Sequence, residues 1–279
     1  MSMGTDRREG AVNVEARTTT ASSTDLEARP RPREADVLHT RLLRLALGAE
    51  ESRSYWENGH DTPSNERSTL AFEERWFGGK SLERVRFLLS SFVVRYDAFP
   101  EALHVLRRWR RMETLTRKLI CHWHLQLSDP LYRAFTGTFL VERARTRTPE
   151  SKVDRDIVRR WLKTTLPERW SEATYVQFAS KLLSAASEAG LVTEKRDPRA
   201  LLVPQVPDLA LAYLLQLLRG IHFKGTLLEN PYLESVGLTG PFLDARLRKL
   251  SGLEFRRMAH LTELSWESPT LRAWAEETL

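Results

Sequence analysis

The sequence has few of the features that mark secreted or membrane proteins. Its 279 residues include a single cysteine, Cys121, so no disulfide can form within the chain, which fits a reducing compartment. The N-terminus lacks the apolar segment of a secretory signal. The most apolar run, residues 209–218, is about half as long as a membrane span. We therefore predict a cytoplasmic protein that does not contact a membrane.

Motifs of known catalytic chemistry are also missing. The sequence contains no G-x-S-x-G, H-E-x-x-H or C-x-x-C motif. Cys121, His122 and His124 lie close together, but a closed zinc site needs four ligands and no second cluster offers the others. We therefore predict a protein that is not an enzyme and that has no metal, no cofactor and no small-molecule substrate.

A short glycine motif could be mistaken for a nucleotide-binding loop. Residues 78–81 read GGKS, the end of a phosphate-binding loop, but the complete motif needs a glycine where Glu74 stands. It should also follow a strand, whereas a helix is predicted before it. We interpret the glycines as a helix end and Ser81 as the N-cap of the next helix.

The composition is typical of a globular protein with a basic surface. Hydrophobic residues make up 41% of the chain and charged residues 29%, which is enough apolar material for a core. The formal net charge is +6, which is compatible with a polyanionic partner. The charge alone does not identify that partner.

Hydrophobic periodicity predicts a mainly α-helical fold with helix-turn-helix or winged-helix elements and a short β-hairpin wing. Residues 1–34 have almost no large apolar side chains and are expected to be disordered. We expect a helical, helix-turn-helix-like domain over residues 35–148. A winged-helix segment should follow over 149–206. A helical region over 207–279, with one short strand candidate over 253–257, should pack on it. Within the first domain, one helix is expected over 36–47 and an uninterrupted helical region from Pro100 through Trp123.

The winged-helix segment has the order helix, turn, helix, hairpin. The two helices are expected over residues 151–165 and 171–189, and two short strands over 191–204 about a turn at Asp197-Pro198. On the second helix, one set of residues at helical spacing should face the core: Val176, Ala179, Leu183 and Ala186. A second, polar set suits a helix that lies close to DNA: Ser171, Thr174, Gln177, Lys181 and Ser184.

Two groups of cations could neutralise phosphates. The first group surrounds the polar helix, with Arg159, Arg160 and Lys163 on the preceding helix and Lys195, Arg196 and Arg199 at the tip of the predicted wing. The second is a basic patch formed by Arg107, Arg108, Arg110, Arg111 and Lys118. The alternative interpretation of this patch is an ordinary solvated face of a helix.

The sequence over roughly residues 36–205 resembles the BrxA proteins of BREX bacteriophage-defence systems. The similarity includes a Ser/Thr-rich helix start with arginines (Ser64, Asn65, Arg67, Ser68, Thr69), the apolar stretch near residues 119–139, and the sequence WSEAT at 170–174 with the helix that follows it. The resemblance implies double-stranded DNA binding without catalysis. It also implies functional partners in the same system: a methyltransferase, an ATPase and a phosphatase-like protein. It places Ser171, Thr174 and Lys181 on the shared helix, and Ser64, Asn65 and Arg67 in the earlier motif.

Two functions therefore follow from the sequence. The first is a non-enzymatic, double-stranded DNA-binding accessory or regulatory component of a BREX system. The second is a protein–protein adaptor that docks other BREX subunits without touching DNA, since winged helices also serve as protein-binding modules.

Overall fold

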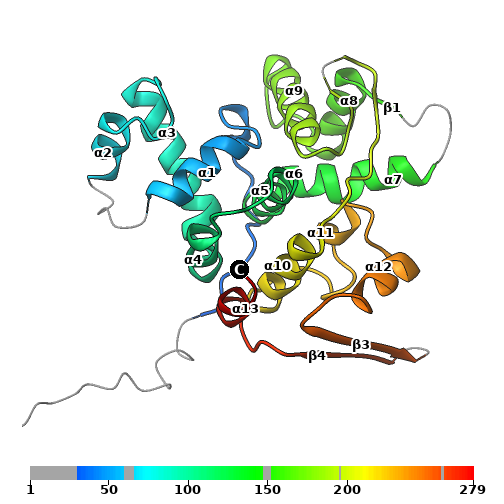
Figure 1. Ribbon diagram of the computed structural model, residues 1–279. Coiled ribbons are helices and arrows are strands. Elements are labelled where there is room, and N and C mark those ends of the chain that lie inside the picture. Colours follow the sequence, from blue (N-terminus) through cyan, green and yellow to red (C-terminus); the bar gives the residue numbers. More distant parts are fainter. Residues whose placement is uncertain (1–29, 60–65, 147–151, 195, 259–260) are drawn as a thin grey trace, which may run out of the picture. The chain divides into compact units, whose positions relative to one another are not determined.

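A computed structural model describes residues 30–59, 66–146, 152–194, 196–258 and 261–279 (Figure 1). The described chain is mainly α-helical with two small antiparallel sheets, which confirms the predicted fold class. Pro32–Leu279 forms one compact unit. Among the described residues, no helix is long and apolar enough to cross a membrane.

The first half of this unit consists of short and medium helices. They are the 3-10 helix η2 (Arg41–Leu43), α1 (Ala49–Asn58), α2 (Arg67–Glu73), α3 (Leu82–Phe92), the π-helical turn η3 (Val93–Asp97), α4 (Pro100–Arg108), α5 (Thr114–Ser128), α6 (Pro130–Ala134), the π-helical turn η4 (Phe135–Phe139) and α7 (Leu140–Arg145).

The second half contains all the strands of the described chain. Its elements are β1 (Lys152–Val153), α8 (Arg155–Thr165), α9 (Glu172–Glu188), β2 (Arg199–Ala200), α10 (Asp208–Arg219), α11 (Pro231–Glu234), α12 (Gly240–Leu247), β3 (Leu253–Met258), β4 (Leu261–Trp266) and α13 (Leu271–Thr278). β1 pairs with β2, and β3 pairs with β4 over six residues each.

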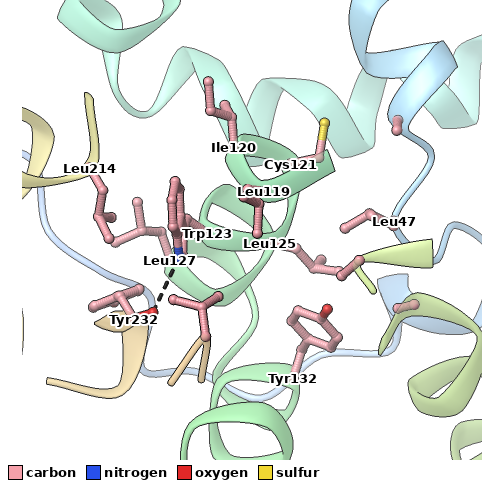
Figure 2. Close-up of a cluster of buried hydrophobic side chains, with 14 of the residues drawn as sticks. Leu47, Leu119, Ile120, Cys121, Trp123, Leu125, Leu127, Tyr132, Leu214 and Tyr232 are labelled. Carbon is pink, nitrogen blue, oxygen red and sulfur yellow. Dashed lines mark hydrogen bonds between the residues drawn. The ribbon is translucent and has the colours of Figure 1, made fainter. Parts of the chain in front are cut away.

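Helix α5 lies at the centre of the core. Every residue from Leu119 to Ser128 is buried, so this helix is surrounded on all sides. It packs against α1, α6, α9, α10 and η3. Figure 2 shows its side chains among Leu47, Leu214 and Tyr232, with the indole of Trp123 donating a hydrogen bond of 3.1 Å to the Tyr232 carbonyl. The buried part of α5 also includes polar residues (His122, His124, Gln126, Ser128), which therefore need hydrogen-bond partners within the core.

Several predicted helix boundaries are confirmed. Ser81 is the N-cap of α3, and its side chain accepts a hydrogen bond from the Arg84 amide. Ser171 caps α9, and Gly190, with a φ of +79°, follows its end. The prediction that the glycines end the preceding helix is wrong, because α2 ends at Glu73 and Arg75, with a φ of +55°, already lies in the turn that follows, ahead of Gly78. In the GGKS sequence, Ser81 alone has the role predicted for it.

The prediction for the first residues of the unit is wrong. The sequence predicts a helix over residues 36–47, but the structure has only η2 there, and α1 begins at Ala49. The chain is extended before η2, and its backbone hydrogen-bonds to distant segments, with Ala35 donating to the Leu127 carbonyl. Long-range hydrogen bonds of this kind replace those of a helix.

The C-terminal bound predicted for the disordered segment, residue 34, is also wrong. Residues 32–34, assigned to it, are ordered against the core. Glu34 is only 6% exposed, accepts a hydrogen bond from the Lys224 amide, and lies 3.7 Å from Arg133. Its buried partners are distant in sequence, so local composition could not indicate this contact. Residues 1–29 lie outside the described residues.

The helical region from Pro100 to Trp123 is not continuous. α4 ends at Arg108 and α5 begins at Thr114, because Trp109 leaves the helical conformation with a ψ of 75°. The Trp109 ring packs 6.1 Å from both Tyr213 and Trp274, measured between ring centroids. Aromatic packing with later parts of the chain therefore overrides the helical periodicity of residues 109–113.

The region after residue 207 packs mainly on the first helices. α10 contacts α5, α13 contacts α4, and α11 contacts α6 and η4. A smaller contact joins it to the winged-helix segment, where the Arg246 guanidinium donates to the Val206 carbonyl at 2.7 Å. All three predicted regions therefore contribute to one hydrophobic core.

The two histidines of α5 are structural. His122 is fully buried and hydrogen-bonds to the hydroxyls of Tyr132 and Ser235, at 2.9 Å each. His124 hydrogen-bonds to the Tyr213 hydroxyl at 2.7 Å and to the Arg95 carbonyl at 3.2 Å. Burial lowers the pKa of both imidazoles to about 3, so both are neutral at pH 7.

These histidines predict a pH-dependent stability. Unfolded imidazoles bind protons near pH 6.5, whereas His122 and His124 in the fold do so only near pH 3. The contribution of these histidines to the free energy of unfolding should therefore be fully present above pH 6.5. Below that pH it should fall by about 1.4 kcal/mol per pH unit for each histidine. Urea unfolding at pH values from 7.5 to 5 measures this slope.

The comparison with variants isolates the histidine contribution. His122→Gln should reduce the slope by about one half, although the variant is less stable at every pH. His222→Gln, at an exposed histidine, is the matched control and should leave the slope unchanged. A wild-type slope in His122→Gln would show that burial of this imidazole does not govern acid sensitivity.

Candidate nucleic-acid interface

The segment from Lys152 to residue 204 has the connectivity of a winged helix (Figure 1). β1 pairs antiparallel with β2, and the two arms of the hairpin meet at an isolated bridge between Val192 and Leu201. The sequence predicts the hairpin but not β1. The helix expected to start at residue 151 begins instead at Arg155, because Lys152–Val153 pairs as a strand and Asp154 caps the helix by accepting from the Ile157 amide.

The second helix buries a wide face. Ala179, Leu183 and Ala186 are buried as predicted, and Val176 is half-buried. Four further buried residues were not predicted: Tyr175, Phe178, Leu182 and Ala185. They are buried because α9 packs against η2 and α5 as well as against α8. Contact with two separate layers widens the buried face beyond the stripe that one partner would need.

The opposite face of α9 is polar and accessible. Gln177 and Ser184 are exposed, and Thr174 and Lys181 are half-buried at its edge. The structure adds Ala173 and Ser180 to this face, which the sequence prediction missed although both have the same helical spacing. The face therefore consists of small side chains, one amide and one cation.

The hydroxyls at the start of α9 already have partners within the chain. Ser171 is the N-cap, so its oxygen accepts a hydrogen bond from the Thr174 amide, and it lies 3.0 Å from the Thr174 hydroxyl. Each hydroxyl retains capacity for another hydrogen bond. The primary role of Ser171 is therefore to set the start and direction of α9.

Two predicted phosphate-binding cations form ion pairs instead. Both Arg159 and Lys163 on α8 contact the carboxylate of Glu172, the first residue of α9. Hydrogen bonds from Lys163 and Arg159 hold the pKa of this carboxyl below its usual value. All three side chains are accessible to solvent, and exposed ion pairs of this kind are weak and are screened by salt. A phosphate could replace Glu172 as their partner.

The other cations of the segment differ in their availability. Among the residues that the structure describes, Arg160, Lys181 and Arg196 have no ion-pair partner. Arg199 lies in β2 rather than at the wing tip, and its guanidinium bonds to Asp197 at 3.1 Å and to the Leu183 carbonyl at 3.1 Å. It therefore fixes the hairpin to α9. Lys195 lies outside the described residues.

Arg67, the described site residue of the earlier motif, does not join this surface. Arg67, on α2, has a side chain that is 14% exposed and donates hydrogen bonds of 3.1 Å to the Tyr55 hydroxyl and the Asp97 carboxylate. These contacts connect α2 to α1 and η3, which is a structural role. Ser64 and Asn65 lie outside the described residues.

The second basic cluster is not one helical face. Arg107 and Arg108 end α4, Arg110 and Arg111 lie in the turn that follows, and Lys118 belongs to α5. Arg110 and Arg111 are exposed and Lys118 is half-buried. Arg107 donates to the Gly59 carbonyl at 3.0 Å, and Arg108 lies 3.8 Å from Glu276. The break at Trp109 keeps these cations from forming a single stripe.

A second helix–helix–hairpin order was missed by the sequence analysis. α11 and α12 are followed directly by β3 and β4, and α12 packs on β3. Only the first of these strands was expected, as a short segment over 253–257. The alternation of buried Leu253 and Phe255 with exposed residues is the signal for it. Arg257 on this hairpin bonds to Asp244 on α12 at 3.0 Å.

Comparisons with known proteins inform the fold alone. No family model matches the sequence, and no curated protein matches it. One solved structure, an uncharacterized protein from Magnetospirillum magneticum, is similar with a TM-score of 0.53 and 15% sequence identity, over 66% of this chain and 98% of that chain. This similarity shows a shared fold and nothing of function.

The placement of Arg67 generates a prediction. Arg67→Ala removes the hydrogen bonds to Tyr55 and Asp97 from a mostly buried guanidinium, so it should lower the free energy of unfolding by about 1–3 kcal/mol. Duplex DNA affinity of the folded protein should not change. Urea unfolding and a DNA titration on the same preparation test both points, with the exposed Arg86→Ala as control. If the variant binds DNA more weakly but is as stable as the wild type, Arg67 contacts DNA and the structural role is wrong.

Proposed function

We propose that this protein is a non-enzymatic, double-stranded DNA-binding accessory component of a BREX phage-defence system, and that α9 enters the major groove. The observation that carries the proposal is the face of α9 opposite the core, which consists of small and polar side chains. A groove about 12 Å wide admits an α-helix only if its outer side chains allow close approach. Ala173, Gln177, Ser180 and Ser184 meet this condition.

The residues on this face match the chemistry of a base pair. The Gln177 amide can both donate and accept, which suits the edge of an adenine. The serine hydroxyls can bond to base edges or to phosphates. Lys181 lies beside them and contributes a charge. In this arrangement the face reads the groove while the surrounding cations hold the phosphates.

Within the winged-helix segment, three cations without ion-pair partners among the described residues lie on α9 and on the elements that flank it. Arg160 is on α8, and Arg196 is in the hairpin turn. In a winged helix docked on DNA, these elements approach the backbones on either side of the groove. Phosphate neutralisation by such groups supplies most affinity that is independent of sequence. The second basic cluster, around Arg110 and Arg111, would be a separate contact if DNA extended to it.

The BREX assignment rests on the resemblance around residues 170–192, together with the winged-helix connectivity. Under this proposal, a methyltransferase, an ATPase and a phosphatase-like protein are functional partners. The protein acts in the cytoplasm, where DNA is accessible.

The adaptor function has its own supporting observation. Leu202 and Val203, just after the hairpin, are 45% and 69% exposed, and they line a cavity of about 330 Å³ with Leu140 and Leu191. Exposed apolar side chains beside a cavity are typical of protein-binding surfaces. An adaptor would use this surface, and it would not need the polar face of α9.

Charge reversal at the interface tests the DNA-binding proposal. Lys181→Glu with Arg196→Glu should weaken binding to a generic duplex. It should also make the salt dependence shallower, by about 0.9 in the slope of log K against log salt for each phosphate that the protein no longer neutralises. Arg86→Glu with Lys224→Glu makes the same change of net charge at exposed positions outside the segment. If both double variants bind duplex DNA as the wild type does, α9 does not face DNA.

Glu172 provides a test of opposite sign. Glu172→Gln removes the carboxylate shared by Arg159 and Lys163, so Lys163 becomes available to phosphates, whereas Arg159 keeps Asp156 at 3.6 Å. We expect tighter duplex binding and a steeper salt dependence, measured by fluorescence anisotropy over a series of salt concentrations. Glu254→Gln, at an exposed carboxylate on β3, controls for the change in net charge. Unchanged affinity in Glu172→Gln would mean that this ion-pair cluster lies away from the DNA.

A further inference from the structure

A large cavity lies outside the winged-helix segment. It has a volume of about 650 Å³ and is bounded by α1, the end of α4, the turn after Arg108 and the first turn of α5. Cavities of about 300–1,000 Å³ are the usual size of small-molecule sites. Its position on the first helices makes it independent of the proposed contact between α9 and DNA.

The wall of this cavity is strongly cationic. Five arginines line it and one carboxylate, Glu57, opposes them: the arginines are Arg53, Arg107, Arg108, Arg110 and Arg117. Arg53 is neutralised by Glu57 at 2.7 Å, and Arg117 by Glu50 at 2.8 Å. Within the described part of the chain, Arg107 and Arg110 have no carboxylate partner. The cavity thus retains an excess of positive charge.

His104 lies in this cavity wall, close to the charges of Arg272 and Arg108. This imidazole lines the cavity and accepts a hydrogen bond from Arg272. Its pKa is lowered, mainly by burial and further by the charges of Arg272 and Arg108. The two arginines therefore act on this imidazole in the same direction as burial, and Glu101 and Glu276 oppose them.

Buried donors without acceptors lie in the same wall. Trp56 is 3% exposed and Arg117 is 7% exposed, yet the Trp56 Nε1–H and the Arg117 Nε–H have no hydrogen-bond partner among the described residues. The Nε–H of Arg107 is also buried and has no acceptor there. These three atoms have almost no accessible surface, so they lie inside the packed wall, and the groups that face a ligand are the exposed guanidinium groups of Arg108 and Arg110.

The start of α5 adds to the positive charge of this wall. The helix begins between Met112 and Arg117, both of which line the cavity. Its N-cap, Glu113, makes no side-chain capping bond, and its first turn holds no acidic residue. The free amides and the positive end of the helix dipole favour an anion at this end.

From these observations we propose that the cavity binds a phosphate monoester, with the arginines around its phosphate and the half-buried ring of Trp109 against its organic part. Arginine forks match phosphate oxygens in geometry, and an indole provides a flat apolar surface. A nucleotide combines both parts. The phosphate could belong to a free mononucleotide or to the 5′ end of a DNA strand, which share this chemistry.

Calorimetric titration of the full chain tests the proposal and identifies the source of the phosphate. The probes are AMP, adenosine, and a short single strand with and without a 5′-phosphate. AMP should bind and adenosine should not. If the strand binds only when phosphorylated and AMP does not bind, the same site recognises strand ends. Equal binding of the probes with and without phosphate, or no binding of any probe, would overturn the proposal.

Two adjacent arginines provide the matched variants. Arg110 lines the cavity and Arg111 does not, and both are exposed in the turn after α4, so neither substitution should prevent folding. Arg110→Glu should weaken binding of the phosphorylated probe about tenfold or more, as expected for the loss of one charge-assisted hydrogen bond. Arg111→Glu should leave it nearly unchanged. An equal loss in both variants would show diffuse attraction to the basic surface, and would refute a defined site.

Discussion

The burial of α5 is the constraint on which the rest of the structure depends. A helix buried on every side must bring all its polar side chains to partners, because an unpaired polar group in the core is costly. Those partners come from distant segments: His124 bonds to Tyr213 of α10, His122 to Ser235 beyond α11, and Trp123 to the Tyr232 carbonyl. These hydrogen bonds fix how the later helices close around the first ones, and they make the regions parts of one core.

This arrangement also positions the candidate interface. α9 packs on α5 and η2 through its broad apolar face, so its orientation is determined by the central core as well as by α8. Glu188, near the end of α9, accepts a hydrogen bond of 2.9 Å from the Ala49 amide at the start of α1. The polar face of α9 is consequently held on a rigid support, which is what precise recognition of a groove needs.

Electrostatic competition is a common theme of both candidate sites. Around α9, carboxylates within the chain occupy Arg159, Lys163 and Arg199, so only part of the local positive charge is available to a polyanion. Around the cavity, Glu57 and Glu50 occupy Arg53 and Arg117 in the same way. In both places the net potential depends on which cations keep an internal partner. Counting basic residues along the sequence therefore overestimates the positive surface.

The sequence alone was sufficient for the fold class, for the helix starts at Ser81 and Ser171, and for the outward orientation of Gln177 and Ser184. Those features depend on capping and helical spacing, which are determined by residues close together in the sequence. Only the tertiary structure decided that residues 36–47 are not helical, that Trp109 interrupts a helix, that Arg67 and Arg199 are internal anchors, and that arginines from three elements surround a cavity. Each of these features depends on a partner far away in the chain, and the neighbouring residues do not indicate which residue that partner is.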